Sequence, residues 1–319
     1  MRRPVATAIL ALTALAGGGA LAQEAYPARP VRFVSCCAGI IDATARVIAD
    51  HVAQSAKQAV VVETKPGASG MLGADFVARS KPDGYTVFIG TNSTHAANQS
   101  LFKQVPYDFV KDFTPVSGIA VGQILLITNL SVPVRNVAEL TELARRQPGK
   151  LTFGWGSSST RAGMELYRQL TGIDVVNVPY KTNPQATSDV MAGQITMMFA
   201  DPVTATPLVK AGKVRGLAAS GTKRLPELPD IPTMQEAGVP GYEMTWWVAA
   251  WTPAGTPRDV VAKLNGWIVE AIRAPKTREY FVTAGLDPYA TTPEELGRFQ
   301  LAEFDKWAKI VKAAGIEPQ

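Results

Sequence analysis

The chain has 319 residues, 46% of them hydrophobic, and carries 32 basic and 27 acidic side chains for a formal net charge of +5. A chain of this length can build two hydrophobic cores. Because no cluster of lysine and arginine alternates with aromatic residues, the composition excludes a nucleic-acid partner.

Residues 1–22 predict an export signal. Arg2 and Arg3 precede an apolar run over 5–15, and Ala20-Leu21-Ala22 supplies the small-x-small pattern of a cleavage site. The apolar run is too short for an ordinary membrane-spanning helix, and an uncleaved anchor is the alternative. We expect cleavage near Ala22 and a soluble, exported mature chain, its charge lowered from +5 to +3 by the loss of the two arginines.

Hydrophobic periodicity predicts strands that alternate with helices. The predicted strands cover 31–34, 60–62, 86–89, 124–128, 151–153, 175–178, 195–199 and 214–219. The predicted helices cover 42–52, 70–80, 137–146, 162–170, a segment from 184, 257–273 and a segment from 292. This alternation indicates an α/β fold with parallel sheets covered by helices.

The strand-to-helix loops are the candidate site, because ligands of open α/β sheets bind at the carboxyl ends of strands. Four loops qualify, at 35–41, 65–70, 91–95 and 154–160. The last reads Gly154-Trp155-Gly156-Ser157-Ser158-Ser159-Thr160 and leads into a helix. Glycines allow close approach, and the N–H groups at a helix start favour negative charge. This run predicts a turn that binds carboxylate or phosphate; the alternative is a plain loop with a helix cap.

The sequence offers little that could catalyse a reaction. His51 and His95 are the only histidines, and no spacing of histidine, cysteine and carboxylate predicts a metal site. The nucleophile elbow, the Walker loop and the dinucleotide-binding glycine pattern are absent from the sequence. Ser220-Gly221-Thr222-Lys223 matches Ser-x-x-Lys but lacks the companion motifs of that catalytic dyad. A binding protein therefore fits better than an enzyme.

Short landmarks run in order through the mature region. They include Tyr26-Pro27-Ala28-Arg29-Pro30, Glu63-Thr64-Lys65-Pro66-Gly67, Lys81-Pro82-Asp83-Gly84-Tyr85, Thr94-His95-Ala96, Val178-Pro179-Tyr180-Lys181, Leu228-Pro229-Asp230-Ile231-Pro232 and Pro253-Ala254-Gly255-Thr256-Pro257. Together they resemble the periplasmic solute-binding proteins of tripartite tricarboxylate transporters, also called Bug receptors. A single string of this kind is weak evidence for the family, but so many strings in the same order make the resemblance specific.

The resemblance implies a two-lobed periplasmic-binding-protein fold in which each lobe is a mostly parallel sheet flanked by helices. The implied lobes are 23–123 and 124–247, with 248–319 returning to the first lobe. A small carboxylic acid is implied to bind in the cleft between them, without metal or organic cofactor, and to pass to the integral membrane subunits of a transporter. We expect a monomer. The alternative function is a receptor that signals to a membrane sensor, with altered or lost carboxylate binding.

The resemblance also implies which residues bind the ligand. They are Cys37, Ala38, Gly39 and Asp42 near the first loop; Thr91, Ser93, Thr94 and His95 after the third strand; Gly156, Ser157, Ser158, Ser159 and Thr160 in the hydroxyl-rich loop; and Tyr180, Asp201 and Trp246. The first loop and the hydroxyl-rich loop are implied to hold a carboxylate through backbone groups and ordered water. For Asp42, capping of the first helix is the alternative role.

The first loop departs from the family pattern. It reads Ser35-Cys36-Cys37-Ala38-Gly39-Ile40-Ile41-Asp42, about two residues shorter than usual and without the usual prolines. Three alternative consequences follow from this altered loop: the protein binds a more apolar acid, its ligand binding is weakened or lost, or the loop takes part in redox chemistry. The adjacent cysteines indicate two partly buried thiols, with a strained vicinal disulfide or an inter-chain bond as alternatives. Trp155, Trp246 and Trp247 predict either an apolar cleft wall or packing at the lobe junction.

Overall fold

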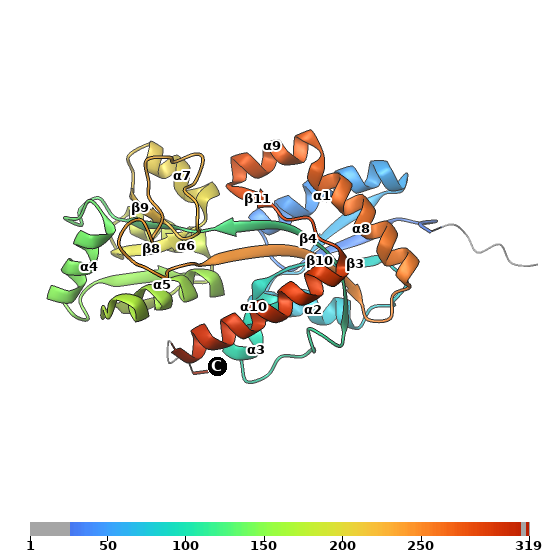
Figure 1. The fold of residues 1–319 in the computed structure, drawn as a ribbon, viewed down its shortest axis with the longest axis horizontal. Helices are drawn as coiled ribbons and strands as arrows, with labels where there is room; N and C mark the ends of the chain where they lie inside the picture. The colour runs from blue at the N-terminus through green and yellow to red at the C-terminus, as the bar shows by residue number, and fades with distance from the viewer. Residues whose placement is uncertain (1–25, 314–316, 319) are drawn as a thin grey trace, which may run out of the picture.

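The computed structural model describes residues 26–313 and 317–318 and shows two α/β lobes, each built on one sheet (Figure 1). The predicted signal segment, 1–22, lies outside the described residues. Lobe 1 contains a sheet of order β11-β4-β10-β3-β1-β2, and lobe 2 a sheet of order β7-β6-β8-β5-β9. The lobe 1 strands are β1 (Val31–Ser35), β2 (Val60–Thr64), β3 (Thr86–Thr91), β4 (Phe113–Gln123), β10 (Thr245–Pro253) and β11 (Leu286–Pro288). The lobe 2 strands are β5 (Leu125–Thr128), β6 (Thr152–Trp155), β7 (Val176–Pro179), β8 (Met197–Ala200) and β9 (Arg215–Ala219).

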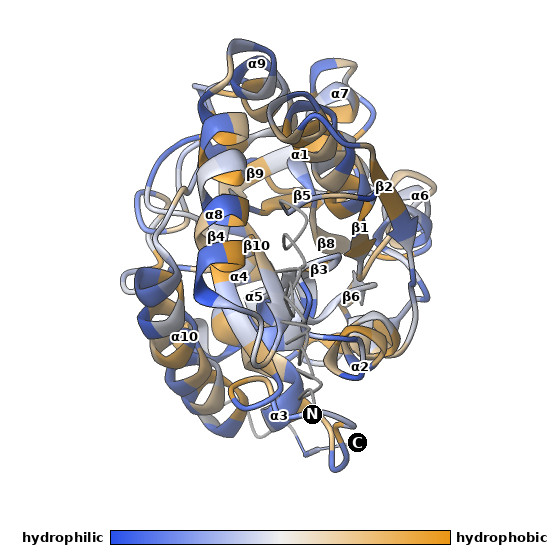
Figure 2. Cartoon of the chain, turned by 90° about the vertical axis from the view of Figure 1, so that its right-hand side faces the viewer, coloured by the Kyte–Doolittle hydropathy of each residue, from blue (hydrophilic) through white to orange (hydrophobic). Residues whose placement is uncertain are grey.

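Helices cover both sheets. Lobe 1 carries α1 (Ile40–Ala56), the short turns η1 (Ala68–Gly70) and η2 (Ser93–Ala97), α2 (Met71–Ala78), α3 (Asn98–Leu101), α8 (Arg258–Arg273), α9 (Pro275–Ala284) and α10 (Pro293–Ala313). Lobe 2 carries α4 (Val137–Arg146), α5 (Ser158–Thr171), α6 (Asn183–Met191) and α7 (Pro202–Lys210). Figure 2 shows hydrophilic stretches on these helices and apolar strands such as β1, β5 and β8 between them. None of the described helices combines the length and apolar character needed to cross a membrane.

The expected two lobes are present, but each sheet is mixed and not mostly parallel. Strand β1 pairs in parallel with β2 and β3, and β6 pairs in parallel with β7 and β8. The remaining pairs, β10 with β3 and β4, β11 with β4, and β5 with β8 and β9, are antiparallel. Most of the antiparallel pairs involve β4, β5 and β10, the strands that carry the chain from one lobe to the other. Neighbouring strands are parallel when a helix crosses over between them. Because β4, β5 and β10 are connected differently, their direction is not set in this way.

The chain passes between the lobes twice (Figure 1). Strand β4 leads through Ile124 into β5, and β10 returns through Met244, so that β10 inserts between β3 and β4. The expected lobe limits at 123 and 247 remain a prediction; β10 already pairs with β4 at Thr245. The indoles of Trp247 and Trp251 both donate to α10, the first to Glu303 (3.0 Å) and the second to Gln300 (2.9 Å).

Candidate functional site

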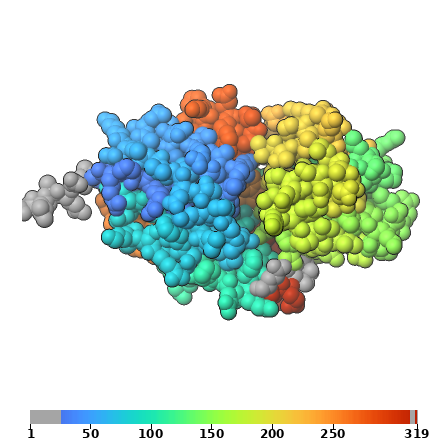
Figure 3. All heavy atoms as spheres, turned by 180° about the vertical axis from the view of Figure 1, so that it is seen from behind, coloured from blue at the N-terminus to red at the C-terminus, as the bar shows by residue number. Residues whose placement is uncertain are grey.

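A groove separates the two lobes on the face shown in Figure 3, between the blue lobe 1 residues and the yellow-green lobe 2 residues. The carboxyl ends of β1 and β3 lie at the same edge of the lobe 1 sheet, because these strands are parallel neighbours. Asn92, directly after β3, donates from Nδ2 to the Ser159 hydroxyl of lobe 2 (3.3 Å). The first-lobe loops therefore meet the start of α5 across this groove.

The hydroxyl-rich loop forms the turn from β6 into α5. Ser157 is the N-cap of α5, with its side chain accepting from the Thr160 N–H (3.3 Å), while the Thr160 hydroxyl accepts from the Ser157 N–H (3.3 Å). This reciprocal pair is a capping box. The helix-cap alternative is thus correct for Ser157 and Thr160, whose hydroxyls bond within the loop.

Asn183 organises this loop, a role that the sequence did not reveal. Its Oδ1 accepts from the Gly156 N–H (2.9 Å), and its Nδ2 donates to Ser157 (3.3 Å) and to the Asp201 carboxylate (3.0 Å). A Cβ at Gly156 would lie 2.2 Å from the Thr182 backbone, so only glycine permits this approach. The helix expected from 184 begins one residue earlier, because Asn183 is the first residue of α6 and Thr182 occupies the N-cap.

Two donors remain free at the start of α5. The N–H groups of Ser158 and Ser159 occupy the first two helical positions, and no acceptor within the described residues binds them. Both residues are almost fully buried, yet Ser159 is in hydrogen-bond contact with Asn92 of the other lobe. Unpaired N–H groups at a helix start carry partial positive charge and bind anions. This end of α5 can therefore accept a carboxylate.

Tyr180 and Asp201 flank the same loop. The Tyr180 hydroxyl donates to Asp189 of α6 (2.6 Å); burial and that carboxylate raise the pKa of Tyr180 to about 12. Tyr180 is therefore an uncharged donor turned toward α6. Asp201 follows β8, where burial raises the pKa of its carboxyl and the Asn183 amide partly opposes the shift. Asp201 thus supports the loop through Asn183.

The first loop runs from Cys36 to Gly39 and leads into α1. Gly39 is the N-cap of α1 with φ 78, and no side chain caps the helix. Cys36 is buried, and that burial raises the pKa of its thiol; Cys37 is half-buried, and both cysteines are free thiols. Ala38 and Gly39 are exposed. The uncapped start of α1 therefore presents a second set of N–H groups that a ligand could bind. These groups lie at the same sheet edge as the end of β3.

Asp42 does not cap α1, so the capping alternative is wrong. It lies in the first turn, where its carboxylate accepts from Arg46 (2.8 Å) and from the Thr64 hydroxyl. Burial tends to raise the pKa of Asp42, but the Thr64 and Arg46 contacts outweigh it and lower the pKa. The carboxylate is thus held as an anion by Arg46 and β2.

The loop after β3 folds back on itself. The Thr94 hydroxyl donates to the Thr91 carbonyl (2.9 Å) and contacts His95 Nδ1 (3.0 Å), while the Thr91 hydroxyl accepts from the Ser93 N–H (3.2 Å). His95 is fully buried and stacks on Trp251 at 3.7 Å between ring centroids. Burial holds its pKa well below the usual range, so the imidazole is neutral. The structure places His95 in the lobe 1 core and not on the groove surface.

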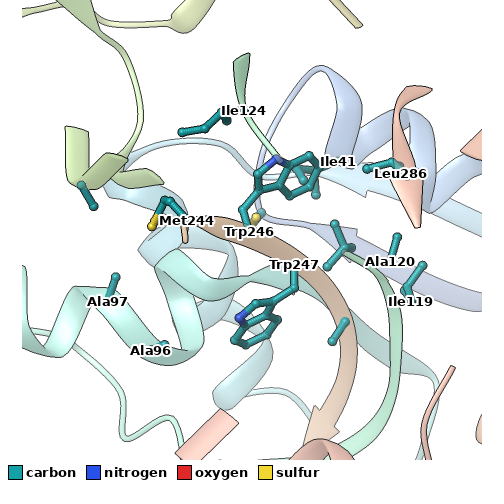
Figure 4. Close-up of a cluster of buried hydrophobic side chains, with 14 of the residues drawn as sticks. Ile41, Ala96, Ala97, Ile119, Ala120, Ile124, Met244, Trp246, Trp247 and Leu286 are labelled. Carbon is teal, nitrogen blue, oxygen red and sulfur yellow. The ribbon is translucent and has the colours of Figure 1, made fainter. Parts of the chain in front are cut away.

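The tryptophans divide between core and loop. Trp246 is buried and donates to the Gln123 carbonyl (3.3 Å), and Trp247 is buried against α10. Figure 4 shows Trp246 on the side of Ile41 and Leu286, with Trp247 on the opposite side of β10. Trp246 packs at the lobe junction, as the second interpretation proposed, whereas Trp247 packs inside lobe 1 against α10 and Trp251. Trp155 is half-buried beside the Arg161 guanidinium, 5.0 Å from its ring centroid.

Within 26–313 and 317–318, no group of three or more histidine, cysteine and carboxylate residues is arranged to hold a metal ion. The structure brings Asn92, Ser158 and Ser159 together and leaves Cys37, Ala38 and Gly39 at the adjoining sheet edge. It turns Tyr180 and Asp42 toward partners within their own lobes. The arrangement can bind an anion through backbone donors.

Comparisons with known proteins agree with this picture. A family model described as "Tripartite tricarboxylate transporter family receptor" matches residues 44–316, beginning just after the altered first loop. A UPF0065 protein from the tcbD-tcbE intergenic region of Pseudomonas sp. strain P51 is 33% identical over 316 residues, covering 97% of this chain and 93% of that protein. BugT of Bordetella pertussis is 30% identical over 300 residues, covering 92% of each chain.

Two solved structures are also similar. R. palustris Rpa4515 with adipate has a TM-score of 0.87 and 34% identity, covering 92% of this chain and 100% of that chain. MatC from Rhodopseudomonas palustris with bound malate has a TM-score of 0.81 and 30% identity, covering 90% of this chain and 100% of that chain. Sequence and structure thus point to the same group of solute receptors.

Proposed function

The chain belongs to the tripartite tricarboxylate transporter receptor family, and from this membership we propose that it captures a small organic carboxylate by lobe closure and delivers it to the membrane subunits of such a transporter. As a member of that family it is a solute receptor and not an enzyme. The proposed site of action is the periplasm, after cleavage near Ala22.

The observation that carries this proposal is the start of α5. Ser158 and Ser159 present two backbone N–H groups without an acceptor, at the point where lobe 2 touches Asn92 of lobe 1. A carboxylate placed there would receive charge-assisted hydrogen bonds, which are the strong ones. The capping box of Ser157 and Thr160 fixes the direction of these donors before a ligand arrives.

We assign the second half of the site to the start of α1. The backbone of Gly39 and Ile40 offers donors there, and no side chain caps the helix. Two helix starts with N–H groups free for a ligand, on either side of one groove, suit a ligand with two acidic ends, and the half-buried Cys37 and Ile40 suit an apolar middle. The similar proteins with adipate and malate support a dicarboxylate of four to six carbons.

Among the implied ligand residues, we retain Cys37, Ala38, Gly39, Ser158 and Ser159 as direct contacts and add Asn92. Thr91 and Ser93 lie beside Asn92 and complete the lobe 1 wall. His95, Trp246, Tyr180 and Asp201 support the site from behind through stacking and hydrogen bonds. The proposed lobes are 23–123 with 248–319, and 124–247.

A titration of the mature protein with succinate, malate, glutarate and adipate tests the proposal. Isothermal titration calorimetry should show one binding site for at least one diacid. Putrescine is the matched control, because it has a similar length and ammonium groups in place of carboxylates, and it should not bind. Benzoate and nicotinate test the alternative of an aromatic acid. If no acid binds or raises the melting temperature, carboxylate capture is wrong and a signalling or interaction role gains weight.

Delivery to a transporter has a separate test. The mature protein, loaded with the acid identified above, should restore uptake of that acid in vesicles that contain the membrane subunits encoded nearest to it. Vesicles supplied with unrelated membrane subunits are the control. Equal uptake with and without the receptor would refute the transport role while leaving the binding result intact.

A further inference from the structure

Ser220, which sequence analysis considered as part of a Ser-x-x-Lys motif, lies at the junction of the two lobes. It follows β9, and its side chain is fully buried. Lys223 is exposed, and the Ser220 hydroxyl donates its hydrogen to the Met244 carbonyl. The pair therefore cannot work as a nucleophile and base, and Ser220 needs a different explanation.

Four hydrogen bonds join Ser220 to the two segments that cross between the lobes. The Ser220 N–H donates to the Ile124 carbonyl (2.8 Å), and the Ser220 Oγ accepts from the Ile124 N–H (2.8 Å). The Met244 N–H donates to the Ser220 carbonyl (2.9 Å), and the Ser220 hydroxyl donates to the Met244 carbonyl (2.5 Å). One residue thus pairs every backbone polar group of both crossing residues.

The surroundings hold this arrangement tightly. The Gln123 Oε1 accepts from the Gly221 N–H (3.0 Å), and a Cβ at Gly221 would lie 2.6 Å from that oxygen. The Trp246 indole donates to the Gln123 carbonyl (3.3 Å) and covers Gly122. Figure 4 shows Ile124 and Met244 in the same cluster as Trp246. Both crossings are therefore packed against Ser220 in one buried layer.

The hydroxyl supplies what the backbone alone cannot. Without it, the Ile124 N–H and the Met244 carbonyl would each lose a partner, although Ile124 and Met244 are only 1% exposed. Buried polar groups are costly to leave unpaired. The hydroxyl thus bonds to both crossings at once, which no other group of the described residues does.

Resting on the proposed function, we propose that Ser220 is the hinge residue of this receptor. Its hydroxyl couples the two crossings, so that both bend at Ile124 and Met244 and the lobes close about one axis. The lobes touch in the described structure through Asn92 and Ser159, and all four Ser220 bonds are present in that arrangement. Ser220 is a positioning residue: it sets ligand affinity without touching the ligand.

The test compares Ser220→Ala with Ser117→Ala. Ser117 is an equally buried serine whose hydroxyl bonds to Gly118 and Thr291, entirely within lobe 1. Both variants should fold and melt a few degrees lower than wild type, because each loses buried hydrogen bonds. Only Ser220→Ala should weaken the binding of adipate or malate, by about tenfold, the factor that one buried hydrogen bond represents. Only Ser220→Ala should also increase the unliganded radius of gyration in small-angle X-ray scattering.

Unchanged affinity and unchanged scattering in Ser220→Ala would overturn the hinge assignment. A matching loss of affinity in Ser117→Ala would also overturn it, because the effect would then be one of general stability. If wild type binds none of the acids in the titration panel, the proposed function fails, and the scattering of the unliganded variants still decides the hinge. If Ser220→Ala does not fold, Gln123→Ala takes its place, since it frees the Gly221 N–H in the same layer and should shift affinity and scattering in the same direction.

Discussion

The backbone N–H of Ser158 can be removed without removing the helix that presents it. Ser158 is the first helical residue of α5, the position at which proline is most readily accepted. The preceding residue, Ser157, is extended at φ −150 and ψ 161, as a residue before proline must be. Ser158→Pro should therefore leave the free energy of unfolding unchanged or raise it slightly.

Carboxylate binding should respond strongly to the same change. The N–H of Ser158 would otherwise donate to an anion, and a hydrogen bond to a charged group contributes about 1.5–3 kcal/mol. Loss of this hydrogen bond corresponds to about a 10- to 150-fold increase in the dissociation constant. Ser158→Ala is the matched control, because it removes the hydroxyl and keeps the N–H.

Isothermal titration calorimetry with the diacid that binds wild type most tightly measures the difference between the two variants. Ser158→Pro should bind at least tenfold more weakly than Ser158→Ala, with circular dichroism showing that both are folded. If the proline variant binds as tightly as the alanine variant, the start of α5 does not hold the carboxylate, and the reasoning from its unpaired N–H groups fails.

Three further outcomes follow from the described contacts. Ser157→Ala removes the cap of α5 and should lower the free energy of unfolding by about 1 kcal/mol in urea; an unchanged midpoint would contradict the capping box. Ser69→Gly should raise the free energy of unfolding by about 0.5–1 kcal/mol, because Ser69 has a left-handed backbone (φ 53) that glycine adopts without strain. As a control, Ser188→Gly in helix α6 should lower the free energy of unfolding. Burial raises the folded-state pKa of Asp201 above its usual 3.8, so the folded state binds the proton more tightly and stability falls as pH rises through that pKa. Asp201→Asn should remove this decline, so that its melting temperature gains on that of wild type as the pH rises above the usual carboxyl pKa; a constant difference between the two proteins would refute it.

The elements that carry local sequence signals are the ones that the sequence predicts correctly. The helix expected over 137–146 matches α4, whose cap Asn136 accepts from the Glu139 N–H. The helix expected from 162 begins earlier, at Ser158, because the hydroxyl residues of its first turn have no apolar periodicity. Strands β4 and β10 were missed, since both are buried on two faces and lack the alternation that marks a half-exposed strand.

The candidate site divides in the same way. The turn before α5 was found because its glycines and hydroxyls act within a few residues of one another. The roles of Asn92, inside the selected loop 91–95, and of Asn183 were not predicted, because their partners lie 67 and 27 residues away and only tertiary packing brings them together. His95 was assigned to the ligand loop by resemblance, whereas its burial depends on stacking with Trp251, far along the chain.

The place of β10 inside the lobe 1 sheet sets the order in which that lobe can be completed. Strands β3 and β4 pair with β10 on either side and not with each other, so both keep an open edge until Thr245–Pro253 has been synthesised. A chain truncated before Thr245 would leave one edge of β3 and both edges of β4 unpaired, because β11 also lies beyond that point, and unpaired strand edges are a template for aggregation. Pairing of Thr91 with Val248 also joins residues about half the chain apart, and contacts so distant in sequence form slowly. Folding of the first lobe therefore waits for about the last quarter of the protein.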